Sequence, residues 1–244
     1  MHEADILSKL LTFPGRMTLY IALVLWLTCH SSHLVANTTN INFYVLNTID
    51  KSLASSLIEE SISTSNIILK NSGIDLTRQV GSIEYPKSLK SIQYDRLDLV
   101  MTQLLIYDRK LYDRLVSNNQ ISLLLLDSKR KPGKPCGSTH PNNYPTVAVI
   151  DINCDSVTLE HELGHLYGAQ HESKFENDLL PYAYASICGN FMTVMSSNSI
   201  EHRDKTILMT YSHPKLEVNG IQCGNRCTNN RKVILENIHL FNSD

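Results

Sequence analysis

Several features that mark special classes of protein are scarce or missing in this sequence. The apolar run at Met17–Cys29 is shorter than the roughly 20 residues that a membrane-spanning helix needs. Lysine and arginine number 22 against 24 aspartates and glutamates, and the net charge of −2 argues against a polybasic surface for nucleic acid or an anionic membrane. We find no internal repeat and no low-complexity tract. The 244 residues, 42% hydrophobic and 19% charged, have the composition of an ordinary globular protein of one or two domains.

The N-terminal segment predicts export rather than a part of the folded protein. Met17–Cys29 has the length of a secretory h-region, and Leu34-Val35-Ala36 is a suitable small-residue cleavage site. We therefore expect residues 1–36 to be a signal peptide. Residues 37–244 would then be secreted, periplasmic or extracellular, without stable membrane association. An uncleaved anchor and a buried helix are the alternatives for the apolar run.

Cysteine usage agrees with an oxidising compartment. Six cysteines are present, but no Cys-x-x-Cys pair occurs, which disfavours a structural zinc site made of four thiolates. Signal cleavage would leave five, for which two disulfides and one free thiol are the simplest outcome. We expect Cys136 to pair with Cys154, because the loop that they close contains the strand that leads into the histidine-rich segment from His161 onwards. Pairing of Cys223 with Cys227 is the second expectation, and it leaves Cys188 free.

The strongest chemical signal is the segment His161–His171, which reads HELGHLYGAQH. A helix places His161 and His165 on one face, one turn apart. Two neutral imidazoles at this spacing can reach a single ion about 2.0–2.1 Å away. Glu162 follows the first histidine, as in H-E-x-x-H sites where the glutamate acts as a general base towards water. The pattern predicts a Zn²⁺ site with Glu162 in the catalytic role.

His171 can be the third metal ligand only if the helix ends before it. On a continuing helix it would lie roughly 9 Å beyond His165 and about 240° round the axis. Gly168 stands where the chain must turn, and glycine takes positive φ without steric cost. Three histidine ligands leave one tetrahedral position open, as in catalytic zinc sites. At ordinary residue frequencies the five fixed positions coincide by chance on the order of 10⁻⁵ of the time, so ordinary core histidines explain the pattern poorly.

This segment resembles the extended zinc signature of the metzincin metallopeptidases. Its flanks are similar to the reprolysin (adamalysin)-like branch, and to the bacterial-type members in particular. A strand, a cysteine and a short spacer precede the zinc helix in PTVAVIDINCDSVTLEHELGH. Downstream, NFMTVMSSNS offers Met195 as the methionine of the turn beneath the zinc, and TYSHPKLEVNG resembles the segment that follows that turn.

The resemblance implies a fold and further roles. It implies an α/β domain with a twisted mixed sheet over a central zinc helix, and a cleft between a part that extends to about residue 171 and a small irregular part from about residue 172. Substrate would pair as an added strand with an edge strand near Cys136–His140. Met195 would form an apolar floor under the histidines. Some metzincins have a tyrosine two residues after this methionine, where this chain has Ser197.

Local patterns predict strands and helices that alternate along the chain before the zinc helix, which is typical of an α/β sheet domain. Apolar spacing, β-branched residues and caps define the individual elements. Expected strands are Asn40–Asn47, Leu76–Tyr85, Ile121–Asp127 and Val147–Ile152, and expected helices are Leu53–Leu69, Leu89–Ser117, the zinc helix after an Asp155 or Ser156 cap, and Arg231–Leu240 after a Thr228 or Asn229 cap.

The sequence thus predicts a secreted zinc-dependent endopeptidase that acts on protein or peptide substrates, with a monomer favoured. His161, His165 and His171 would hold the zinc. A catalytically silent, zinc-stabilised binding or adhesion module is the first alternative, and Glu162 argues against it. A zinc hydrolase of another amide is the second. We expect Glu172 to be a loop carboxylate rather than a fourth ligand. Histidines without ligand spacing are expected on the surface or in loops: His140, His202, His213 and His239.

Overall fold

The computed structural model describes residues 37–91, 96–117, 120–128, 134–172, 180–197, 202 and 204–241. The chain divides into two units, Met1–Val35 and Ala36–Asp244, and all described residues belong to the second. The predicted signal peptide, residues 1–36, lies outside them. No helix within the described ranges is long and apolar enough to cross a membrane.

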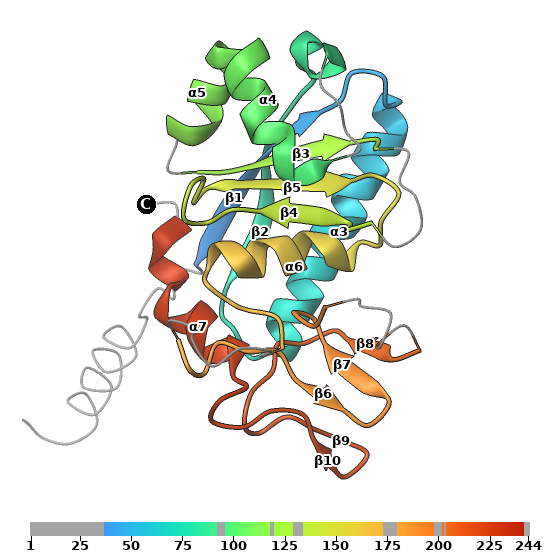
Figure 1. The fold of residues 1–244 in the computed structure, drawn as a ribbon. Helices are drawn as coiled ribbons and strands as arrows, with labels where there is room; N and C mark the ends of the chain where they lie inside the picture. The colour runs from blue at the N-terminus through green and yellow to red at the C-terminus, as the bar shows by residue number, and fades with distance from the viewer. Residues whose placement is uncertain are drawn as a thin grey trace, which may run out of the picture. The chain divides into compact units, whose positions relative to one another are not determined.

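A five-stranded, twisted mixed sheet with the strand order β2-β1-β3-β5-β4 forms the centre of this unit (Figure 1). Its first four strands in this order run parallel, and β4 pairs antiparallel with β5 at the edge. All six residues of β3 and all five of β5 are buried, because helices cover both faces of the sheet. The strands are β1 (Thr38–Val45), β2 (Thr77–Glu84), β3 (Ile121–Leu126), β4 (Gly137–Thr139) and β5 (Val147–Asp151).

Helices α3 (Lys51–Asn71) and α6 (Val157–Leu166) pack against each other on one face of the sheet, and α4 and α5 lie on the other (Figure 1). The side chain of Asp50 caps α3 by accepting hydrogen bonds from the backbone of Ser52 and Leu53. All four expected strands and the first expected helix are confirmed, with ends that differ from the expected ones by at most two residues.

The expected long helix Leu89–Ser117 is wrong. The structure has shorter pieces there: η2 (Lys87–Ser91), η3 (Leu97–Leu99), α4 (Val100–Tyr107) and α5 (Arg109–Ser117). Asp108 interrupts the second half with non-helical dihedral angles, φ −145° and ψ 71°. Its carboxylate accepts a 3.0 Å hydrogen bond from the backbone of Leu111, so it caps a new helix. The apolar spacing continues across this break, and spacing alone therefore suggested one helix.

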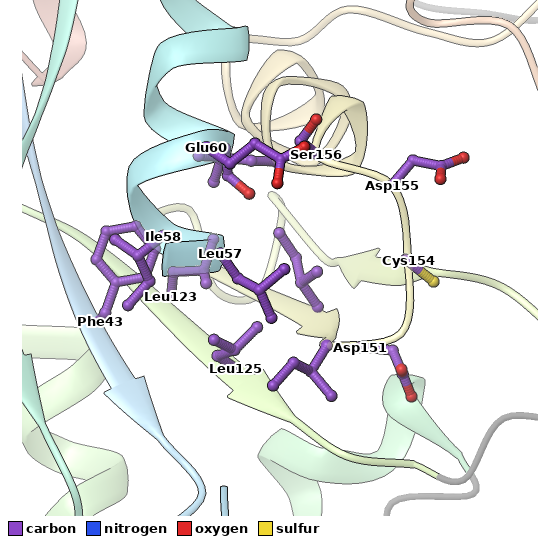
Figure 2. Close-up of a pocket in the computed structure, with 14 residues that line it drawn as sticks. Phe43, Leu57, Ile58, Glu60, Leu123, Leu125, Asp151, Cys154, Asp155 and Ser156 are labelled. Atoms are coloured by element: carbon purple, nitrogen blue, oxygen red, sulfur yellow. The ribbon is translucent and has the colours of Figure 1, made fainter. Parts of the chain in front are cut away.

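A cavity of about 210 Å³ lies between α3 and the sheet (Figure 2). Its walls are apolar and include Phe43, Ile58 and Leu123, while the exposed carboxylates of Glu60 and Asp155 stand near its mouth. The lining contains no histidine. This cavity is therefore separate from the site that the sequence motif predicts.

The part of the unit after α6 is irregular and contains short elements (Figure 1). Three short strands form one sheet, two form a hairpin, and a helix and a 3₁₀ turn are the last described elements. Asn229 caps this last helix by accepting from the backbone of Lys232. The elements are β6 (Ile187–Cys188), β7 (Phe191–Thr193), β8 (Thr206–Leu208), β9 (Glu217–Val218), β10 (Ile221–Gln222), α7 (Asn230–Glu236) and η5 (Ile238–Phe241).

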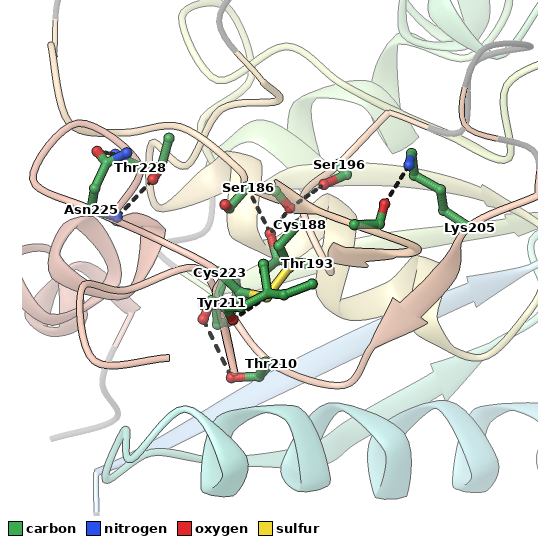
Figure 3. Close-up of a disulfide and its surroundings, with 12 residues drawn as sticks. Ser186, Cys188, Thr193, Ser196, Lys205, Thr210, Tyr211, Cys223, Asn225 and Thr228 are labelled. Atoms are coloured by element: carbon green, nitrogen blue, oxygen red, sulfur yellow. Dashed lines mark hydrogen bonds between the residues drawn. A yellow bond between two sulfur atoms is a disulfide. The ribbon is translucent and has the colours of Figure 1, made fainter. Parts of the chain in front are cut away.

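One of the two expected disulfides is confirmed and the other is wrong. Cys136 pairs with Cys154, with Cα atoms 5.7 Å apart. The second disulfide joins Cys188 to Cys223 (Figure 3), and Cys227 is the exposed free thiol. Cys223 is fully buried, whereas Cys227 lies in a tight turn whose backbone is hydrogen-bonded to the Asn225 side chain. Short sequence separation suggested the wrong pair, because β6 brings Cys188 to Cys223 from 35 residues away.

Candidate metal centre

Helix α6 presents His161 and His165 on the same side, because four residues make slightly more than one turn. Ser156 precedes the helix, but its side chain makes no capping hydrogen bond. Both imidazoles are partly buried. The histidines therefore start from a rigid element rather than from a loop.

A sharp turn at the end of α6 brings the third histidine back to the other two. Tyr167 is the last residue with helical geometry, and Gly168 follows with φ +93°, a value that favours glycine. The backbone of Ala169 donates to the Gly164 carbonyl, as expected for a helix that ends at a glycine. The backbone of Gln170 then donates a hydrogen bond to Ala183 and accepts one from Ala185, and these bonds hold the chain before His171.

The three Nε2 atoms meet at one point. Nε2 of His171 lies 3.0 Å from that of His161 and 3.1 Å from that of His165. Nitrogens held tetrahedrally at 2.0–2.1 Å from one zinc ion would be about 3.3 Å apart. Among the described residues this is the one group of histidine, cysteine or carboxylate side chains with the spacing of a metal site. The triad has the donor type and the spacing that zinc requires.

Backbone carbonyls determine which nitrogen carries the proton on two of these rings. Nδ1 of His161 lies 2.8 Å from the carbonyl oxygen of Val194, and Nδ1 of His165 lies 2.8 Å from that of Ala169. A carbonyl oxygen only accepts, so each Nδ1 donates its proton and each Nε2 keeps a free lone pair. Burial lowers the pKa of His161 to about 4 and that of His165 to about 3. Both rings are therefore neutral at pH 7 and ready to bind a cation.

Glu162 points towards the edge strand β4. It is buried, and its Oε2 accepts a 3.3 Å hydrogen bond from Oγ1 of Thr139. A methyl group added at Gly137 would lie 2.5 Å from Cγ and from Cδ of Glu162, so the carboxylate packs directly on the strand backbone. Burial raises the pKa of Glu162 to about 8, and the bond from Thr139 opposes the rise. A pKa near neutrality suits a general base.

Met195 is fully buried and lies under α6. Its sulfur occupies the space where a side chain on Gly164 would otherwise lie. Gly164 lies between the two helical histidines. Val194, the residue before Met195, supplies the carbonyl that accepts a hydrogen bond from His161. The turn that carries Met195 thus contacts the helix at the level of the histidines.

Glu172 connects the segment after the third histidine to the turn that carries Met195. Its carboxylate accepts a 2.9 Å hydrogen bond from the backbone of Ser197 and a second from the Ser197 hydroxyl. Nε2 of His202 lies 3.6 Å from the same carboxylate. Glu172 is therefore occupied by these partners and lies outside the metal-site group. The other histidines that the structure describes also lie outside it: His140, His202, His213 and His239.

These groups open into one large cleft of about 1140 Å³. The three histidines and Glu162 line it together with β4 on one side and with Ser196, Ser197 and Ile207 on the other. The cleft thus lies between the sheet part and the irregular part. Strand β4 is the sheet edge that the sequence places near Cys136–His140, and it borders the cleft.

The sequence analysis did not identify the residues that contact α6 on the face opposite to the histidine triad. The metal-binding motif gives no role to Glu160, yet this residue is fully buried and pairs with Arg78. Its position between Leu159 and Leu163, on the face turned away from the histidines, was the available signal. A charge on the buried face of a helix requires a buried partner.

None of the protein-family models matches the chain. A peptidyl-Asp metalloendopeptidase of Stenotrophomonas maltophilia is 25% identical over 192 residues, which cover 75% of this chain and 46% of that protein. The chain thus spans less than half the length of this curated relative.

Solved structures also resemble this chain, and two of them illustrate the range of similarity. The structure of a chaperone–substrate complex matches 86% of this chain and 35% of its own with a TM-score of 0.65 at 17% identity, which is a likeness of fold alone. Metalloproteinase-II from Bacteroides fragilis matches 59% of this chain and 46% of its own at 19% identity with a TM-score of 0.33, a value too low to support an argument.

Proposed function

We propose that this chain is a zinc-dependent endopeptidase of the metzincin type. The observation that carries the proposal is the convergence of three histidine Nε2 atoms within hydrogen-bonding distance, in the same cleft as a buried glutamate. The name of the Stenotrophomonas relative supports a metallopeptidase.

His161, His165 and His171 would hold the ion. Zinc bound there would supply a Lewis acid that polarises the scissile carbonyl and makes water more acidic. Glu162 takes a proton from the attacking water on a carboxylate oxygen and passes it to the leaving amine. Thr139 holds that carboxylate through its hydroxyl, so Glu162 is oriented before substrate arrives.

The substrate would lie along β4. This strand is hydrogen-bonded to β5 on one side and forms the sheet edge on the other. An extended peptide can pair with such an edge through main-chain hydrogen bonds. Since Thr139 and Gly137 contact Glu162 from the same strand, the strand would align both the peptide and the general base. The cleft volume of about 1140 Å³ leaves room for several residues.

The two disulfides fit an extracellular protein. We propose export through the apolar N-terminal segment, with residues 1–36 removed. Mass spectrometry of the exported protein would test this, and a mature N-terminus at or near Asn37 is expected. An N-terminus at Met1 or Met17 would refute it.

The function is tested by replacing Glu162 with glutamine in protein that holds one equivalent of zinc. The rate of cleavage of a denatured protein substrate should fall roughly 10²–10⁴-fold, while the zinc content stays the same. Glu59→Gln, an exposed change on α3, is the matched control and should keep the parent rate. If the parent binds zinc but cleaves no peptide bond, the silent binding module is the correct function. Continued cleavage by Glu162→Gln would refute the role of the glutamate.

A further inference from the structure

The face of α6 that is turned away from the histidines carries an ion pair without solvent contact. The guanidinium of Arg78, on β2, donates two hydrogen bonds to the carboxylate of Glu160, at 3.2 and 3.1 Å. Both side chains are 0% exposed. Burial alone would lower the pKa of Arg78, but Glu160, together with Tyr167 and Tyr211, more than offsets this and raises it. The guanidinium therefore carries its charge inside the folded protein.

Arg78 also binds the end of the same helix. Its Nη1 donates to the hydroxyl of Tyr167 at 2.8 Å and to that of Thr39 at 3.2 Å. Tyr167 is seven residues after Glu160, which places the two on one side of the helix, about two turns apart. It also immediately precedes Gly168, where the chain turns towards the third histidine. One guanidinium thus contacts α6 at its middle and at its C-terminal end.

A tyrosine from the part of the chain after α6 completes the cluster. The Tyr211 hydroxyl donates to Oε1 of Glu160 at 2.7 Å and lies 3.1 Å from its backbone carbonyl. Tyr211 is fully buried, and its backbone N–H donates to Ser72 at the end of α3. The carboxylate of Glu160 is thereby bound by a strand of the sheet and by the C-terminal part together.

We propose that the Arg78–Glu160–Tyr211 cluster is a positioning device that sets the rotation and height of α6, and hence the metal affinity of the histidine triad. The inference rests on the proposed function, since it concerns the same zinc site. Glu160 and Tyr167 lie roughly 130° round the axis from the histidines. A helix rotation of about 10° would move a side-chain end that is 5–6 Å from the axis by about 1 Å. Directional hydrogen bonds resist such a rotation, whereas apolar contacts allow sliding.

An experiment can distinguish a positioning role of the cluster from a contribution to the stability of the fold. A buried ion pair contributes little net stability, and a pair of apolar side chains of similar volume often replaces it without loss. Stability alone would therefore not require these charges. The double substitution Arg78→Met/Glu160→Met removes both charges and leaves neither partner unpaired. Its matched control is Arg114→Met/Glu84→Met, which removes a half-exposed ion pair between Glu84 on β2 and Arg114 on α5.

The experiment measures three quantities on the purified full-length chain: thermal unfolding of the metal-free protein, Zn²⁺ affinity by chelator competition, and the visible absorption spectrum of bound Co²⁺. For Arg78→Met/Glu160→Met we expect cooperative unfolding close to that of the parent, a 10–100-fold loss of Zn²⁺ affinity and a changed Co²⁺ spectrum. The control should match the parent in affinity and spectrum. Parent-like affinity and spectrum in a folded Arg78→Met/Glu160→Met variant would overturn the inference and leave the proposed function intact.

A milder variant keeps the test decisive if the double variant does not fold. Tyr211→Phe removes one hydroxyl and no charge, and it should weaken Zn²⁺ binding in the same direction by several-fold. Unchanged affinity in a folded Tyr211→Phe protein would then overturn the inference. If the parent chain itself bound neither Zn²⁺ nor Co²⁺, the metal centre and the proposed function would both be refuted. This outcome is distinct from every outcome of the variant measurements.

Discussion

A single methyl group on the edge strand should disable the proposed general base without removing the metal. In Gly137→Ala the new carbon would lie 2.5 Å from Cγ and Cδ of Glu162. Ordinary contacts begin near 3.4 Å, so either the strand or the carboxylate must move by about 1 Å. Relief of such overpacking costs about 1–3 kcal/mol of stability. A displacement of about 1 Å at a reacting group can lower the rate roughly 10²-fold, which is about 2.7 kcal/mol in the activation free energy.

The assay compares kcat/KM for a quenched fluorescent peptide with the zinc content of the same samples. Gly137→Ala should keep one zinc per chain, because the atoms nearest to the new carbon belong to Glu162 and not to the histidines, and its rate should fall about 100-fold. Ser138→Ala is the matched control. It changes the next residue of the same strand, whose hydroxyl has only a 3.5 Å contact to His140, and it should keep the parent rate. A Gly137→Ala rate within about twofold of the parent, with zinc bound, would refute the close packing of Glu162 on β4.

Three more changes have defined outcomes. His171→Ala should weaken Zn²⁺ binding at least about tenfold because one of three ligands is lost, and chelator competition that shows no change would assign the third ligand elsewhere. Replacing Cys188 and Cys223 together by serine opens a loop of 35 residues and should lower the free energy of unfolding by roughly 3–4 kcal/mol in urea titrations; a loss below about 1 kcal/mol would contradict this. Arg78→Met alone leaves Glu160 charged without its partner and should cost about 3–5 kcal/mol in the same titrations, where an effect typical of a surface arginine would be inconsistent with the buried pair.

Features that depend on nearby residues were predictable from the sequence. Strand β3 followed from a continuous apolar run, and the approach of the third histidine followed from Gly168, because a glycine at that spacing allows the chain to turn. The edge position of β4 came from a family resemblance and was found at the expected residues, Gly137–Thr139. These predictions needed only the order of neighbouring residues or a motif of fixed length.

Contacts between distant residues were not predictable in this way. Arg78 and Glu160 are 82 residues apart, and no local pattern indicates which cation will meet a buried carboxylate. Cys188 meets Cys223 only because short strands fold the C-terminal part back on itself. Asp108 broke a predicted helix because its side chain could cap the next one, a competition that apolar spacing does not record.

The placement of the two disulfides has a practical consequence. The loop closed by the Cys136–Cys154 bond lies entirely before α6 in the chain, and the loop closed by the Cys188–Cys223 bond lies entirely after it. A backbone cut anywhere between Cys154 and Cys188 would therefore leave two fragments that neither bond joins. They would migrate separately on a denaturing gel without reductant, so a non-reducing gel directly reports self-digestion in this stretch, whereas nicks inside either closed loop would become visible only after thiol treatment.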